Sequence, residues 1–287
     1  MSGMWEVIKW PLIACLILPP LLTYLGMHVV RRGVIFVDLA MAQVASLGTC
    51  LALFLGYSLH DRATFWIALV VSFAHAILLS ATRNSEKYHV PQEAVVGVPF
   101  VFAAAASILF LSKVAGGQDE VQNLLIGDIL SVTPADVVQR AAVFVLLAIF
   151  YAFFHKKLML ISFDPRGAEA LHVRLWDFLF YAPFAVVIVN FVAVAGTLLT
   201  FSYLIVPAVC ASMLAERFYA RLLIGWGISA LASVGGLVAS CLFDLPTGAA
   251  IVCALGMLLA VVGTAVVVRK HLHDRTRHRP NLMGQDV

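Results

Sequence analysis

Long apolar runs recur along the whole of this 287-residue chain and leave little sequence between them. A helix of about 20 apolar residues crosses the hydrocarbon core of a bilayer. Runs of about this length cover residues 10–30, 34–58, 63–82, 93–112, 136–154, 176–195, 198–215, 220–242 and 247–268. Backbone N–H and C=O groups in lipid must be paired internally, so such runs fold as helices. The sequence therefore predicts an all-α polytopic membrane protein with about nine transmembrane helices, or eight if one short segment is re-entrant.

Composition leaves no room for a separate soluble domain. The chain is 62% apolar and only 12% charged, whereas a soluble domain carries about 25% charged residues. We therefore expect one transmembrane domain over residues 1–268. A basic cytoplasmic tail without fixed structure is expected over residues 269–287.

Several of these runs contain helix breakers. The sixth and seventh are separated only by "VAGTL", residues 194–198, so they are either two short spans or one helix with a broken or re-entrant segment. Proline removes a backbone donor inside a helix, so kinked or interrupted helices are expected at Pro19-Pro20, Pro99, Pro183 and Pro207. Such breaks are tolerated where the freed carbonyl groups face protein or water, as in transporters.

The distribution of basic residues predicts the orientation. With nine spans and a cytoplasmic C-terminus, most Lys and Arg residues between the spans lie on the cytoplasmic side. Only Lys9, Arg62, Lys113 and Arg140 remain outside. Cytoplasmic loops carry an excess of Lys and Arg, so we expect the N-terminus outside and the C-terminus inside.

Two connections between the spans are long enough to bind partners. The outer one, residues 112–139, shows helical periodicity after Val121 and suits docking of an extracytoplasmic protein. In the inner one, residues 155–177, Asp164 can cap a short helix that has Pro165 at its first position. That helix suits a groove in a cytoplasmic partner, although a surface helix lying at the membrane interface fits the same pattern.

No motif for catalysis is present in the sequence. The phosphate-binding pattern GxxxxGK[ST] does not occur, so ATP chemistry would have to come from another chain. No nucleophile and base occur at catalytic spacing either. We expect neither enzymatic activity nor a bound cofactor.

Six stretches in order resemble one known family. They are "VVRRGVIFVDLAMAQVASLG", "QEAVVGVPFVFAAAASILFLS", "NLLIGDILSVTPAD", "FDPRGAEALHV", "VAGTLLTFSYLIVPAVCASML" and "LFDLPTGAAIVCALG". Together they resemble the permease subunit of the metal-ion ABC transporters, which import zinc, manganese or iron into bacteria. The resemblance implies an inner-membrane protein that works with a second copy of itself, cytoplasmic ATPases and an extracytoplasmic metal-binding protein. Membrane lipid surrounds such a permease, and no nucleic-acid partner is expected.

The resemblance also implies a role for the inner connection. Residues 163–174 would form the coupling helix that docks into the ATPase. The residues expected to make this contact are Phe163, Asp164, Pro165, Ala168, Glu169 and Leu171.

In this family the second span carries an Asp and a His four residues apart, both implicated in the ion path. Here Gln43 stands where the His is expected, and Asp38 lies one residue too early. Five residues is about 500° of helix, which puts these two side chains about 140° apart. They cannot easily share one ion, and an amide is a poor zinc ligand.

Three readings of Asp38 remain open from the sequence. It can belong to a metal path that is completed by residues elsewhere, such as His75 or Cys210. It can serve a different ion or a small metal complex. It can instead be a structural partner for Arg31 or Arg32.

Alternatives remain for the other candidates and for the function itself. His75 alone is also consistent with a buried core histidine, and Gln43 with an interhelical hydrogen bond. A secondary transporter without an ATPase is the alternative function. The scarcity of intramembrane acids and of inverted repeats of broken helices speaks against it.

Overall fold

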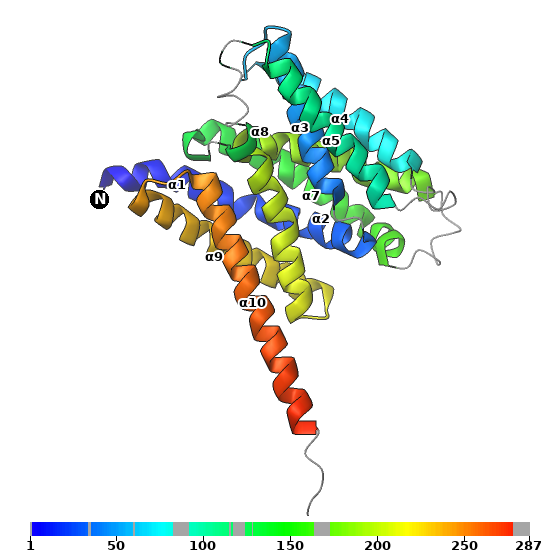
Figure 1. Ribbon diagram of the computed structural model, residues 1–287, viewed down its shortest axis with the longest axis vertical. Helices are drawn as coiled ribbons and strands as arrows, with labels where there is room; N and C mark the ends of the chain where they lie inside the picture. The colour runs from blue at the N-terminus through cyan, green and yellow to red at the C-terminus, as the bar shows by residue number, and fades with distance from the viewer. Residues whose placement is uncertain are drawn as a thin grey trace, which may run out of the picture.

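The computed structural model describes residues 2–33, 36–59, 61–82, 92–114, 116, 124–127, 129–163 and 173–277. Its regular elements are helical throughout these ranges (Figure 1). They are α1 (Ser2–Ile17), α2 (Pro19–Arg32), α3 (Phe36–Phe54), α4 (Arg62–Thr82), α5 (Gln92–Leu111), η2 (Ile129–Ser131), α7 (Pro134–Phe163), α8 (Val173–Leu214), α9 (Phe218–Phe243) and α10 (Thr247–Arg277).

The predicted fold class is confirmed. Within the described ranges, 8 helical stretches are long and apolar enough to cross a membrane. The sixth and seventh predicted runs are the two halves of α8, whose apolar stretch Arg174–Leu214 has 41 residues. A straight helix of that length would measure about 62 Å, about twice the thickness of a bilayer core.

A glycine contact explains where α8 breaks. Gly196 has φ 72° and ψ 172°, a conformation that residues with a Cβ rarely adopt. Gly127 of the outer connection lies against it, and a Cβ added to Gly196 would come within 2.5 Å of the Gly127 nitrogen. Gly248 at the start of α10 approaches the same loop, because its Cβ would lie 2.2 Å from the Ile126 carbonyl oxygen. Part of the outer connection therefore packs into the break in α8.

The predicted effect of the prolines is only partly correct. The first apolar run does divide, because α1 ends at Ile17 and α2 begins at Pro19. Pro99, however, lies inside α5, and Pro183 and Pro207 lie inside α8, whose non-helical residue is Gly196. These three prolines therefore do not interrupt their helices. In α8 the tertiary contact between Gly196 and Gly127, rather than the missing N–H group of a proline, sets the position of the break.

The core is built around α8, which packs against α2, α3, α4, α9 and α10. In Figure 1 the helices α3, α4 and α5 form one group beside it, and α10 projects from the body. Fully buried aromatic residues on α8 fill the centre, namely Phe180, Phe184, Phe191 and Tyr203. Only 11% of the most apolar stretch of α10 is buried inside the protein, against 78% of the most apolar stretch of α8. The helix α10 also continues past residue 268, the predicted end of the transmembrane domain, to Arg277.

Candidate functional site

Asp38 lies in the first turn of α3 and is almost completely buried, with 1% of its surface exposed. Its Oδ1 accepts a hydrogen bond of 2.8 Å from the Leu39 backbone N–H group. Among the described residues, Oδ2 has no hydrogen-bond partner. The positive end of the helix dipole favours a carboxylate in this turn. The structure thus places an acid inside the protein with one oxygen still available.

The alternative in which Asp38 forms an ion pair with Arg31 or Arg32 is wrong. Arg32 forms its ion pair with Asp177, at 2.9 Å between Nη1 and Oδ1. The guanidinium of Arg31 lies over the ring of Phe163, 5.1 Å from its centroid. Neither arginine pairs with Asp38 in the described part of the chain.

His75 lies on α4, which packs directly against α3. A Cβ added to Gly48 on α3 would come within 2.5 Å of the Ala68 Cα, so the two helices cross closely there. Measured from this crossing, Asp38 lies about 15 Å along α3 and His75 about 10 Å along α4. Both lie toward the same end of the pair, because a short connection makes the helices antiparallel. His75 is 4% exposed, and its Nε2 is unpaired among the residues described.

Three more buried hydroxyl groups lie on helices that contact one another. They are Ser46 on α3, Ser72 on α4 and Thr197 on α8, and each side-chain oxygen is without a hydrogen-bond partner in the described ranges. These three helices pack on one another. Buried polar atoms are paired in the great majority of cases, so these three unpaired hydroxyl groups are candidates for contact with water or a passing ion.

Sequence reasoning did not single out these hydroxyl groups. A signal existed for Ser72, which precedes His75 by three residues and so shares its helix face. Thr197 follows the break at Gly196 and could be recognised only once that break was placed. Cys210 is buried on the second half of α8, and no three His, Cys, Asp or Glu side chains cluster for a metal within the parts described.

Gln43 is half-buried, unlike Asp38 on the same helix. This difference agrees with the rotation of about 140° expected for five residues. The two side chains therefore do not present a shared pair of ligands on one face of α3.

Most of the expected coupling helix lies outside the described residues, namely Asp164, Pro165, Ala168, Glu169 and Leu171. Phe163 is described as the last residue of α7. Its ring packs edge-on against that of His28 on α2, with 6.0 Å between centroids. This end of α7 is thus fixed to α2.

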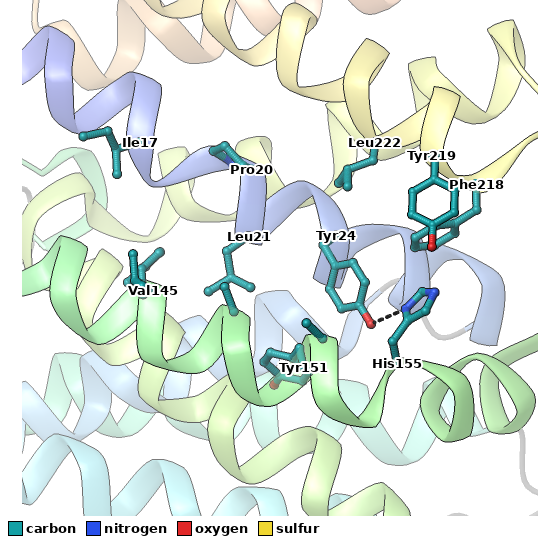
Figure 2. A pocket seen from close by; sticks show the side chains of 13 residues that line it. Ile17, Pro20, Leu21, Tyr24, Val145, Tyr151, His155, Phe218, Tyr219 and Leu222 are labelled. Atoms are coloured by element: carbon teal, nitrogen blue, oxygen red, sulfur yellow. Dashed lines mark hydrogen bonds between the residues drawn. The ribbon is translucent and has the colours of Figure 1, made fainter.

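A cavity of about 410 Å³ lies apart from Asp38 and His75, between α2, α7 and α9 (Figure 2). At one end the Tyr24 hydroxyl and His155 Nδ1 form a hydrogen bond of 3.0 Å. Its remaining lining is largely apolar and includes Leu21, Val145 and Leu222. It contains no acidic residue, so it lacks the oxygen ligands that hard divalent cations prefer.

Comparison with known proteins decides the class of the chain. Residues 4–266 match the ABC 3 transport family. This chain belongs to that family. The resemblance recognised from six short stretches is thereby confirmed, since the match includes all of them.

Curated relatives within the family are transport membrane proteins. The chain is 25% identical over 231 residues to the manganese transport system membrane protein MntC of Listeria innocua, covering 79% of each protein. It is 26% identical over 239 residues to the manganese import system permease protein ScaB of Streptococcus gordonii, covering 82% of this chain and 83% of ScaB.

A solved structure shares the fold. PsaBC from Streptococcus pneumoniae, determined in complex with a Fab, superposes with a TM-score of 0.74 at 23% identity. The superposition covers 89% of this chain and 90% of that one. The helical arrangement described above is thus shared with that solved structure.

Proposed function

We propose that this chain is the membrane permease of a bacterial ATP-binding cassette importer that moves Mn²⁺ inward across the plasma membrane. Two observations carry the proposal together: the family match over residues 4–266 and the buried, half-satisfied carboxylate of Asp38. The named relatives MntC and ScaB are manganese transport proteins.

The ligand chemistry of the α3–α4 region favours Mn²⁺ over Zn²⁺. Carboxylate, carbonyl and hydroxyl oxygens suit manganese, whereas zinc prefers imidazole and thiolate. Asp38 offers a carboxylate, and Ser46 and Ser72 offer hydroxyl groups. His75 supplies one imidazole, and no second imidazole stands at position 43, where the chain has Gln43. In this proposal, Asp38 and His75 bind the passing ion, and the hydroxyl groups replace part of its water shell.

The chain requires partners to do this work. Two copies would form the transmembrane part, and cytoplasmic ATPases would drive alternating access through the connection that contains residues 164–172. An extracytoplasmic metal-binding protein would deliver the ion to the outer face. We expect that protein to dock on the outer connection, which packs into the break of α8 through Gly127.

Transport by the reconstituted complex tests the proposal. The chain would be purified with its ATPase and binding protein, placed in liposomes, and assayed for uptake of manganese, zinc and iron. We expect ATP-dependent manganese uptake that exceeds zinc uptake by about tenfold. Uptake driven by an ion gradient without ATP would instead support a secondary transporter. ATP-dependent uptake of zinc alone would contradict the assignment of manganese.

A further inference from the structure

A buried polar cluster joins three helices next to the inner connection. Arg32, the last residue of α2, donates from Nε to Ser162 Oγ at 3.0 Å and from Nη1 to Asp177 Oδ1 at 2.9 Å. Ser162 lies at the end of α7, and Asp177 lies in the first turns of α8. These two residues bracket the connection 164–172, so one guanidinium contacts both of its stems.

Further contacts fix the orientation of this guanidinium. Its carbon lies 4.1 Å from the centroid of the Phe180 ring and 5.4 Å from that of Tyr181. His28, one turn earlier on α2, shares a hydrogen bond of 2.9 Å with Ser162 Oγ through Nδ1. The side chains of Arg32 and Asp177 are only 7% and 1% exposed. The cluster is therefore held from several sides rather than being a surface ion pair.

The energetics of the Arg32–Asp177 ion pair indicate that it orients the helices more than it stabilises the fold. Taking two charges out of water costs about as much as their attraction returns, so a buried ion pair is weak support for stability as such. The planar fork of arginine, however, can bond two acceptors in fixed directions at once, which an ammonium group does less well. Here the two acceptors belong to different helices, so the fork sets the spacing of α7 and α8.

The cluster also adjoins the candidate ion path. After Arg32, Gly33 caps α2 in the left-handed conformation, with φ 70°. The helix α3 starts at Phe36 and carries Asp38 in its first turn. Only a few residues of chain separate Arg32 from the start of α3, so a shift of the loop stems would reach α3 through Arg32.

We propose that Arg32 is a positioning residue that transmits movement of the inner connection to the helix carrying Asp38. It does so by holding both stems of residues 164–172 against the end of α2. This inference rests on the proposed function, because it assumes that an ATPase acts on that connection. Arg32 itself contacts neither the ion nor ATP in this role.

Amide hydrogen exchange and transport coupling together test the proposal in the full complex. The variants are Arg32→Gln, which removes the guanidinium group and its charge, and Arg32→Lys, which keeps the charge. Arg174→Gln is the matched control, because Arg174 is an exposed arginine on the same stem of α8. Exchange would be followed in peptides covering 155–163 and 173–181, and coupling as manganese ions carried per ATP hydrolysed.

With Arg32→Gln we expect exchange at both stems to rise about tenfold and coupling to fall about fivefold, while the ATPase still binds. Arg32→Lys should give an intermediate loss, because one ammonium cannot replace both bonds. The Arg174→Gln control should stay within about twofold of wild type in both measurements.

If Arg32→Gln does not fold, a variant that removes only one of the two hydrogen bonds of Arg32 still tests the proposal. Ser162→Ala removes the α7 bond alone, so exchange should rise in 155–163 and remain normal in 173–181. Normal exchange and coupling in folded Arg32→Gln, or in Ser162→Ala, would overturn the proposal. Failure of the wild-type complex to carry manganese would instead refute the proposed function, because the exchange measurement does not depend on the ion.

Discussion

A carboxylate in the first turn of a membrane-spanning helix is tolerated because the backbone N–H groups there point toward it. Asp38 uses one such group, that of Leu39, and keeps Oδ2 unpaired within the described residues. His75 on the neighbouring helix is buried in the same way. At the scale of single residues, the proposed function assigns these side chains to a passing cation rather than to each other's packing.

Replacing His75 separates a ligand from a core histidine. His75→Leu keeps the volume and removes a buried nitrogen that is unpaired in the described structure, so unfolding free energy should change by less than about 1 kcal/mol. Manganese uptake per folded molecule should nevertheless fall. Thermal unfolding in detergent and uptake in liposomes measure the two effects. A marked loss of stability with normal uptake would identify a core histidine.

Restoring an imidazole at position 43 should not create zinc transport. Gln43→His places a zinc ligand on α3, yet about 140° of helix separates it from Asp38. We expect zinc uptake to stay at the wild-type level in the same liposome assay. A rise of about tenfold would show that the two positions do meet around one ion.

At the scale of elements, the apolar runs predicted the helices well because lipid forces each run to pair its own backbone. The position of the break in α8 was harder to predict. Its break depends on Gly127 and Gly248, which are distant in the chain from Gly196. The same limit applies to Arg32, whose partner Asp177 is 145 residues away. Polar residues inside apolar runs therefore pointed to Asp38 and His75, but the sequence did not reveal the cluster at the loop stems.

The break in α8 can be tested with one methyl group. Gly196→Ala forces a side chain into a left-handed conformation and toward the Gly127 nitrogen, at 2.5 Å. The strain alone should cost about 1–3 kcal/mol, and the clash adds to it. We expect a lower melting temperature and a lower yield of folded protein.

Gly235→Ala is the matched control for this change. Gly235 lies inside α9, and a Cβ there would meet nothing within 4 Å. Alanine in a helix interior is favoured over glycine by about 1 kcal/mol, so this variant should be as stable as wild type or more so. Equal stability of the two alanine variants would contradict the role given to Gly196.

At the scale of the whole molecule, α8 forms the buried centre while α7 and α10 expose most of their apolar surface. Such surfaces suit lipid or a second copy of the chain. The distribution of basic residues predicts the orientation of the chain in the membrane, because they gather between spans on one predicted side.

Topology reporters test that direction. A reporter fused after Arg279 should give a cytoplasmic signal, and one inserted in residues 115–120 should give an external signal. Both follow from the excess of Lys and Arg on the predicted cytoplasmic side. Signals from the same side at both positions would show that the count of crossings between them is wrong.

The most direct test of the account is manganese uptake by Asp38→Asn in the reconstituted complex. The change removes the charge but keeps the size and the acceptor for the Leu39 N–H group. Glu216→Gln is the control, because Glu216 is an exposed acid outside the candidate path. We predict that Asp38→Asn folds and binds its ATPase normally while uptake falls about tenfold or more, and that the control is unchanged. Wild-type uptake by folded Asp38→Asn would contradict the account, since the ion would then cross the membrane without this carboxylate.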